Sequence, residues 1–590
     1  METKSSYLIN AGDIFLVDSQ FKEASICYLK ALSFNPSNEL LLRIYNNLGI
    51  CYKRMGRLED AEIILRKGLA TEPHHHSFYS NLASLYRIKN DQQKAIENLL
   101  KAVSLGSKMG DYLVLSELYK KQKQYKQALD IALLTVQKFP NEYEAYLNLG
   151  NIFAFLKSYD NARNPYLKAI ELAPEKTQAY NNIGVAYKEL GENENALSAY
   201  QKVLQLNPND PAVHNNLGNL MRNMDDMQSA IYHLELSIKL SPNYADAYSN
   251  LGAVYKESKN YKKAVIYYHK ALEINPNHTN ANFDLSLIEL SNGDYERGWK
   301  RYEHRLKMAE LLAKTQVYHK PIWRGESLIE KIVILQNEQG FGDNIMFVRY
   351  ATQLAELGAK VIIRTRLQLV ELFQSVKGVF SVINEDDTIP EYDFYLPLLS
   401  CPQRFQTKLS SIPNQFPYLS TDCKTPILVD KKKFNIGLSW SGSHTNKGHK
   451  DRYIGLKALS ELFELKGIAW YSLQVGDDSD QIEKLKLKNK VIDKTELFTD
   501  FSQTAAFINE LDLVITGDTS IAHLCGALKK EAFVLLSQPA EWRWLQKGTS
   551  SPWYDDNLIL VRQEARGDWH TPILYIKEEL KKHTKAYMKK

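Results

Sequence analysis

Four short polar segments each follow an apolar run, and their residue types are suited to binding a charged ligand or accepting a proton. Asn337–Asp343 reads NEQGFGD, and Thr516–His523 reads TGDTSIAH. Ser439–His444 reads SWSGSH, and Ser472–Gly476 reads SLQVG. Glycines permit tight turns and close approach of a ligand, whereas hydroxyls, amides and carboxylates supply directed hydrogen bonds. These four segments are therefore the candidate binding or catalytic segments of the chain.

Asp343 ends the polar segment that follows the apolar run KIVILQ, and it opens an expected helix that extends to about Leu357. A carboxylate in this position is a candidate general base for a hydroxyl proton. The alternative is a helix N-cap, which aspartate often provides. Both interpretations remain open at this point, because an N-terminal helix position lowers the pKa of a carboxyl whereas burial raises it.

The segment TGDTSIAH leads into an expected helix at 520–528, whose first backbone amides and positive dipole end suit a phosphate. Thr519 and Ser520 add hydroxyl donors, Asp518 precedes them, and His523 lies near the first turn. The alternative is an N-cap followed by a histidine in the core. The segment is therefore a candidate phosphate site.

Hydroxyls and cations also follow the third apolar run. Ser439, Ser441 and Gly442 are followed by three basic residues, which are Lys447, Lys450 and Arg452. They are suited to a phosphate, although a solvated basic loop has the same composition, and charge alone does not choose among the three. Gln474 ends a further strand, where its amide is suited to reading the edge of a base.

The elements that must position these segments are short apolar strands alternating with helices from Lys331 onward. The expected strands include KIVILQ, KVIIRT, FNIGLSWSG, IAWYSLQVG, LDLVITGD and EAFVLLSQ. Continuous apolar strands separated by helices predict parallel sheets covered on both faces. We expect two such lobes, at 328–427 and 433–580, with ligands in a cleft at the carboxyl ends of the strands. A packed connector at 313–327 would precede them, and a basic tail at 581–590 would follow.

The first half of the chain repeats at 34 residues. A small residue recurs at Ala24, Ala61, Ala95, Ala128, Ala162, Ala196, Ala230, Ala264 and Gly298. Twelve residues after it, proline ends the second helix of most units, since proline cannot donate its backbone hydrogen bond there. About nine helical hairpins over 5–312, the last one degenerate, would stack into a superhelix with a concave groove.

One column of this repeat is nearly all asparagine, on the first helix of each unit. Its six predicted peptide-binding members are Asn47, Asn81, Asn148, Asn182, Asn216 and Asn250. A primary amide donates and accepts at once, so a row of them suits the backbone of an extended peptide. The alternative is that these side chains cap or bridge neighbouring repeats.

Composition excludes several classes of protein. Of 590 residues, 44% are hydrophobic and 24% charged, which describes a folded chain, and the net charge of +5 is too small to predict nucleic-acid binding. Five scattered cysteines without a CxxC pair indicate neither a disulfide scaffold nor a structural zinc. We see no signal peptide and no apolar run of 18 residues, so we expect a cytoplasmic protein without a membrane span.

The repeats resemble the tetratricopeptide repeat, including that of the O-linked N-acetylglucosamine transferases. The phrases DLVITGDTSIAHLCGALKK, PAEWRWLQKGTSSPWY and GLSWSGSHTNKGHKDRYIGL resemble bacterial proteins that join such repeats to a heptosyltransferase-like glycosyltransferase. Flagellin glycosyltransferases that attach nonulosonic acids are similar in the order of their parts. The resemblance implies an α-solenoid followed by a GT-B fold of two Rossmann-like lobes, with a metal-independent activity and no cofactor.

The resemblance also implies roles for individual residues. Asp343 matches the proposed general base, and Asp518, Thr519 and His523 match a motif at the donor diphosphate. Ser439 and Ser441 match hydroxyl residues of a strand-end loop, and Arg452 approximately replaces a lysine that contacts phosphate. Together with Gly442, Lys447, Gln474 and Ser520, which are chosen on their own chemistry, these are the predicted donor-binding residues. The first lobe is shorter than in lipopolysaccharide heptosyltransferases, so we expect a protein acceptor, flagellin foremost, in the repeat groove. The donor would be a nucleotide-sugar, possibly a CMP-nonulosonic acid. The alternatives are a non-enzymatic repeat scaffold and a glycosyltransferase directed at a saccharide or lipid.

Overall fold

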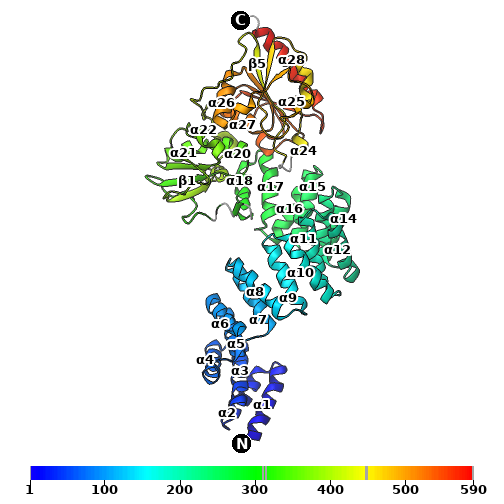
Figure 1. Cartoon of the computed structure of the whole chain (residues 1–590), viewed down its shortest axis with the longest axis vertical. Helices are drawn as coiled ribbons and strands as arrows, with labels where there is room; N and C mark the ends of the chain where they lie inside the picture. Colours follow the sequence, from blue (N-terminus) through cyan, green and yellow to red (C-terminus); the bar gives the residue numbers. More distant parts are fainter. Residues whose placement is uncertain (1, 309–310, 313–314, 316, 445–448, 588–590) are drawn as a thin grey trace. The chain divides into compact units, whose positions relative to one another are not determined.

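The computed structural model describes residues 2–308, 311–312, 315, 317–444 and 449–587 (Figure 1). The chain divides into two compact units, Met1–Val254 and Tyr255–Lys590. The sequence pattern ends the repeats at 312, whereas this division falls inside helix α15 (Ala245–Glu257). The last hairpins therefore share a unit with the α/β lobes.

Helices in consecutive hairpins account for the repeats. The first helices are α1 (Glu2–Val17), α3 (Asn38–Arg54), α5 (His76–Ile88), α7 (Met109–Lys121), α9 (Tyr143–Phe155), α11 (Thr177–Glu189), α13 (Pro211–Asn223), α15 and α17 (Thr279–Ser291). The second helices are α2 (Phe21–Leu32), α4 (Leu58–Thr71), α6 (Gln92–Ser104), α8 (Tyr125–Lys138), α10 (Tyr159–Leu172), α12 (Asn193–Leu206), α14 (Met227–Leu240), α16 (Tyr261–Ile274) and α18 (Tyr295–Tyr302). The described residues thus contain the expected nine hairpins.

Small residues bring the two helices of a hairpin together, as the sequence pattern predicts. A Cβ added at Gly150 or Gly184 would lie 2.5 Å from the ring of Tyr166 or Tyr200 on the second helix. Both tyrosine rings are buried. Glycine is needed at these positions because the tyrosine occupies the space of a side chain.

The second unit contains two parallel sheets. The first has the order β3-β2-β1-β4, from β1 (Ile332–Gln336), β2 (Lys360–Thr365), β3 (Val379–Asn384) and β4 (Phe394–Pro397). The second has the order β10-β9-β8-β5-β6-β7, from β5 (Phe434–Ser439), β6 (Ile468–Ser472), β7 (Val491–Ile492), β8 (Leu513–Gly517), β9 (Ala532–Leu536) and β10 (Leu558–Arg562). Every strand pair is parallel. The expected fold class, a repeat solenoid followed by α/β lobes, is confirmed.

Helices connect and cover these strands. They are α20 (Phe341–Phe347), α21 (Tyr350–Glu356), α22 (Leu367–Phe373), α23 (Cys401–Arg404), α24 (His449–Arg452), α25 (Gln481–Lys484), α26 (Phe501–Glu510), α27 (Ser520–Leu528) and α28 (His570–Tyr587). The single helix expected from Asp343 to Leu357 is wrong, because α20 and α21 are separate. Between them the buried side chain of Arg349 turns back and donates to the carbonyl of Met346 at 2.8 Å.

An aromatic cluster joins the last repeat to the lobes. Trp299 of α18 lies edge-on to Trp542 and Trp553 of the second lobe, with ring centroids 5.3 and 6.1 Å away. The indole nitrogen of Trp553 donates to the hydroxyl of Tyr295 at 2.8 Å. Burial of several large rings stabilises this contact strongly, so α17 and α18 belong to the same core as the lobes.

Candidate functional site

The strand order of both sheets reverses at the same kind of position. In the first sheet β1 lies between β2 and β4, and in the second β5 lies between β6 and β8. Ligands of open parallel sheets bind at the carboxyl ends of strands beside such a reversal. The loops after β1, β5 and β8 are the polar segments Asn337–Asp343, Ser439–His444 and Thr516–Ser520. The structure therefore places three predicted segments at the reversals.

A cleft of about 950 Å³ lies between the two lobes. Its walls include Gly340–Asp343 from the first lobe, Ser439, Ser441–Ser443 and Asp518–Ile521 from the second, and Trp542 and Arg543 beyond β9. Phe283 and Leu287 of α17 also line it. Ligand pockets are typically a few hundred to about 1,000 Å³, so the cleft has room for a nucleotide-sized ligand.

Helix α27 presents its N-terminus to this cleft. Thr519 is its N-cap, and the threonine hydroxyl oxygen accepts a hydrogen bond from the backbone N–H of Ile521 at 3.2 Å. Ser520 begins the helix and lines the cleft. The free N–H groups and dipole of the first turn create positive potential there. The alternative, an N-cap followed by a buried histidine, is what the structure shows, whereas phosphate binding at this helix end stays a prediction.

Asp518 is held by two donors of the second lobe. Its Oδ1 accepts from the indole nitrogen of Trp544 at 2.8 Å, and its Oδ2 pairs with Arg452 at 3.4 Å. The Asp518 carboxylate therefore orients a cation of the cleft wall. Lys447 lies outside the described residues, as does the side chain of Lys450, so Arg452 is the basic candidate that the described structure brings to the cleft.

His523 is buried in the wall between the lobes. Its Nδ1 lies 2.7 Å from the hydroxyl of Tyr554, and its ring stacks on Trp544 at a centroid distance of 5.1 Å. Burial lowers the pKa of His523 to about 4, against the opposing charge of Asp518. A Cβ added to Gly342 would lie 2.6 Å from Cδ2 of His523. The glycine of the first loop therefore permits close contact with α27.

Asp343, the predicted base, is already paired. One carboxylate oxygen forms an ion pair with Arg543, and the other accepts from the backbone N–H of Gly340 at 3.3 Å. Burial disfavours the charged guanidinium, but the carboxylates of Asp343 and Glu541 outweigh it and raise the pKa of Arg543. Arg543 is not among the site residues expected from the sequence. Its segment, EWRWL, lies 200 residues from Asp343, and no spacing connects the two.

The hydroxyl loop after β5 is organised by Gln474. The Gln474 Oε1 accepts from the backbone N–H groups of Trp440 and Ser441 at 3.1 and 3.0 Å, and from the Ser439 hydroxyl at 3.4 Å. Its Nε2 donates to the carbonyl of Asp477 at 2.9 Å. The Ser441 hydroxyl donates to Asp478 at 2.6 Å. The Gln474 amide, expected to read a base edge, thus forms hydrogen bonds that hold this loop. Gly442 lines the cleft.

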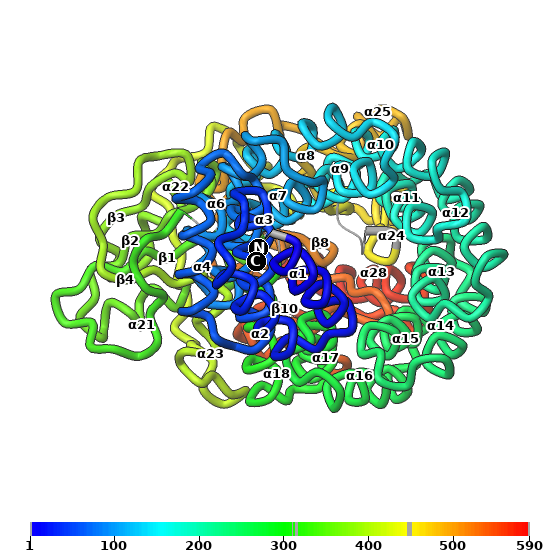
Figure 2. Tube along the Cα trace, turned by 90° about the horizontal axis from the view of Figure 1, so that it is seen from below, coloured from blue at the N-terminus to red at the C-terminus, as the bar shows by residue number. Residues whose placement is uncertain are grey.

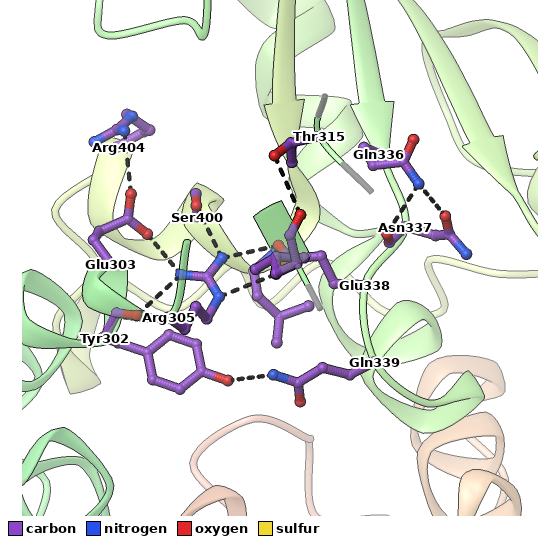
Figure 3. Close-up of polar contacts among 12 residues, drawn as sticks. Tyr302, Glu303, Arg305, Thr315, Gln336, Asn337, Glu338, Gln339, Ser400 and Arg404 are labelled. Carbon is purple, nitrogen blue, oxygen red and sulfur yellow. Dashed lines mark hydrogen bonds and ion pairs between the residues drawn. The ribbon is translucent and has the colours of Figure 1, made fainter. Parts of the chain in front are cut away.

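A buried ion pair anchors the loop after β1. Arg305 follows α18 in the short helix η1 (Glu303–Lys307), and it donates from two nitrogens to Glu338 at 2.8 and 3.0 Å. Figure 3 shows this pair beside Ser400, and the amide of Gln339 reaching the hydroxyl of Tyr302. The segment η1, directly after the last repeat, therefore fixes the loop that leads into α20 and Asp343.

The asparagine column connects neighbouring repeats of the first unit. Each predicted member donates its side-chain amide to the preceding repeat, namely Asn47 to Asp13, Asn81 to Asn46, Asn148 to Ser116, Asn182 to Asn151, Asn216 to Asn181 and Asn250 to Asn215, at 2.7–3.3 Å. The bridging interpretation therefore describes this column, and one amide hydrogen of each side chain is not free for a peptide. Binding of a peptide through the remaining polar atoms stays a prediction.

The bridges lie on helices that contact one another along the repeats. Successive first helices touch, for example α9 with α11 and α11 with α13. Figure 2 shows the first unit following a curve, with α11 nearer its inside and α12 nearer its outside. The asparagine column is half-buried in this inner layer.

The described residues contain no group of three or more histidine, cysteine, aspartate or glutamate side chains placed to hold a metal ion. They also contain no helix with the length and apolar character needed to cross a membrane.

Comparison with known families agrees with the repeats. Tetratricopeptide repeat models match residues 42–75, 76–106, 177–210, 199–232 and 245–278, and a TPR repeat model matches 150–191. Solved structures include YrrB, a TPR protein with an unusual peptide-binding site, at 24% identity over 33% of this chain and all of YrrB, with a TM-score of 0.26. Yeast Tom70 is 14% identical over 52% of this chain and 93% of its own, with a TM-score of 0.31.

The chain thus carries tetratricopeptide repeats, followed by an α/β region with two parallel sheets. Among curated proteins it is similar to protein FlbA of Caulobacter vibrioides, with 22% identity over 311 residues. That alignment covers 47% of this chain and 51% of FlbA. The chain therefore spans about half the length of this relative.

Proposed function

We propose that this protein transfers a sugar from a nucleotide-sugar to a serine or threonine hydroxyl of a protein. The observation that carries the proposal is the cleft at the reversals of two parallel sheets. One wall holds the carboxylate of Asp343, and the other holds the N-terminus of α27 and Arg452. Resemblance of the loop sequences to heptosyltransferase-like enzymes supports the same reaction.

In this reaction the bond between the sugar carbon and the donor phosphate oxygen breaks, and a bond from that carbon to the acceptor oxygen forms. The departing phosphate gains negative charge, which the first amides of α27 and Arg452 stabilise. The hydroxyl proton of the acceptor passes to Asp343. A positioned general base typically contributes about 10²–10⁴-fold to the rate.

In this proposal the repeats bind the protein acceptor. The inner layer of the first unit offers the asparagine column, whose unused amide atoms are suited to an extended backbone. Flagellin is the leading candidate acceptor, and a CMP-nonulosonic acid is a candidate donor, on the resemblance described above. The reaction would take place in the cytoplasm, where nucleotide-sugars are available.

The proposal is tested by intact-mass spectrometry of surface and secreted proteins from cells with and without the gene. Loss of one or more sugar-sized increments from a protein is expected, and the increment identifies the sugar. An unchanged mass of every protein would favour a saccharide or lipid acceptor, or a non-enzymatic scaffold.

The role of Asp343 is tested on the modified protein found in this way. Asp343→Asn should lower the transfer rate by about 10²–10⁴-fold, because the carboxylate no longer accepts the hydroxyl proton. Asp555→Asn is the matched control, since Asp555 is an exposed aspartate paired with Lys529 at 3.0 Å. Near-normal transfer by a folded Asp343→Asn protein would contradict the assignment of the base.

A further inference from the structure

The ion pair between Asp343 and Arg543 is an unexpected feature of a site that needs a free base. It joins the first lobe to the second across the cleft, and the two side chains are only 14% and 12% exposed. Arg543 also lies over the ring of Trp542 at 4.5 Å and within 3.6 Å of Glu541. In this arrangement the guanidinium occupies a carboxylate oxygen of Asp343 that the proposed reaction needs for the acceptor hydroxyl.

A second aspartate–arginine pair in the cleft differs in the other hydrogen bonds that its aspartate accepts. Asp518 and Arg452 are 3.4 Å apart, and Asp518 keeps its hydrogen bond from Trp544 if Arg452 moves. Asp343 would keep only the Gly340 N–H, at 3.3 Å. Removal of Arg543 would therefore leave a carboxylate with one weak donor, whereas removal of Arg452 would not.

An anionic ligand in this cleft would compete with Asp343 for Arg543. The planar guanidinium binds phosphate or carboxylate oxygens in a bidentate manner. Arg543 and the N-terminal residues of α27 line the same cleft, so a donor phosphate held by the helix would lie within the region that Arg543 also lines. Such a phosphate would offer Arg543 a second anionic partner.

We propose that Arg543 is an exchangeable cation that neutralises Asp343 in the empty cleft and binds the anionic part of the donor when the donor enters. This inference rests on the proposed function. The exchange frees Asp343 to accept the acceptor proton only after the donor is bound. Donor binding before acceptor deprotonation follows directly from this arrangement.

The proposal makes opposite predictions for the two partners of the pair. Asp343→Asn removes the competitor for Arg543, so a nucleotide should bind this inactive variant more tightly than it binds the wild type. Arg543→Gln removes the cation, so the nucleotide should bind more weakly. Loss of one charge-assisted contact corresponds to about tenfold in affinity, and Arg543→Lys should lie between, because lysine keeps the charge but not the fork.

Isothermal titration calorimetry of the full chain measures these affinities, with UDP, GDP, ADP, CDP and CMP as separate probes. Arg297→Gln is the control, since Arg297 is 69% exposed and pairs with Asp294 on α18. The fluorescence of Trp542 gives a second readout, because departure of Arg543 from its ring changes the emission. The nucleotide-induced change should be smaller in Trp542→Phe than in the wild type.

The outcomes separate this inference from the proposed function. Tighter binding to Asp343→Asn and weaker binding to Arg543→Gln support the exchange. If a probe binds the wild type but Asp343→Asn binds it equally or less tightly, the exchange is overturned and the nucleotide site stands. If no probe binds the wild type, the donor site itself is absent and both proposals fail.

Discussion

At the scale of single residues, His523 differs most from its sequence-based interpretation. The resemblance gave it a role at the donor phosphates, where a positive imidazolium would help. Burial against Trp544 and Tyr554 instead lowers its pKa to about 4, so the ring is neutral near pH 7. In the described part of the chain, the positive charge at the cleft comes from Arg366, Arg452, Arg543 and the N-terminus of α27.

This burial predicts an acid-sensitive second unit. As the pH falls from 6.5 toward 4, His523 becomes protonated in the unfolded chain but stays neutral in the folded one. The free energy of unfolding therefore decreases over this range, and the stability that the neutral histidine contributes above pH 6.5 is lost. The difference from the ordinary pKa corresponds to at most about 3 kcal/mol. The free energy of unfolding should fall less steeply with acidification in His523→Asn than in the wild type or in the exposed control His570→Asn.

Tryptophan fluorescence measures the free energy of unfolding of the second compact unit. All eight tryptophans lie at or beyond Trp299, so their emission reports the unit Tyr255–Lys590 and not the first unit. Denaturant titrations at pH 7, 6 and 5 give the pH dependence of each variant. Equal pH dependence in wild type and His523→Asn would show that His523 titrates normally.

At the scale of elements, the loop after β1 depends on the helix that follows the last repeat. Arg305 is 2% exposed and Glu338 is fully buried, and the Glu338 carboxylate also accepts from the backbone N–H of Leu399 at 2.9 Å. Buried charges of this kind are costly to leave unpaired, even when the intact pair adds little net stability. The pair therefore positions η1 against the loop that leads into α20 and Asp343.

Removing one partner should cost more than removing both. We expect Arg305→Met to lower the free energy of unfolding of the second unit by about 3–5 kcal/mol, since Glu338 is left as a buried, uncompensated charge. The double variant Arg305→Met with Glu338→Met should recover much of this loss. Lys307→Met, at an exposed position of η1, is the control. Additive losses in the double variant would mean that the two side chains act independently.

At the scale of the whole molecule, the chain consists of two compact units with separate cores. The repeat core of the first unit is built from contacts between neighbouring hairpins, whereas the second unit combines helices α17 and α18 with both lobes. Units with separate cores can unfold in separate transitions. A ligand of the cleft stabilises only the unit that binds it.

Thermal unfolding of the full chain should therefore show two transitions by far-ultraviolet circular dichroism and one by tryptophan fluorescence. A bound nucleotide at 100 times its Kd should stabilise the fluorescence-detected transition by about 2.7 kcal/mol and leave the other unchanged. Coincident transitions by both probes, shifted together by nucleotide, would show that the two units unfold as one.

The sequence by itself determined the features that depend on local order along the chain. The 34-residue spacing specifies the hairpins, because each small residue faces a helix of its own or the next unit. The apolar runs specify β1, β2, β5, β6, β8 and β9, and the segment after β8 specifies the start of α27 at Ser520. The expected strands did not include β3, β4, β7 and β10. Strand β3 is mostly half-exposed, β4 and β7 are short, and β10 ends in a charged residue, so none of them forms a long apolar run.

Only the tertiary structure decided which side chains meet. Arg543 reaches Asp343 over 200 residues, Arg305 reaches Glu338, and Tyr554 reaches His523. The asparagine column has a clear period, yet its bridges depend on how one hairpin rests on the next. Such pairs leave no periodic trace in the chain, because a contact between distant segments constrains two positions and not the spacing between them.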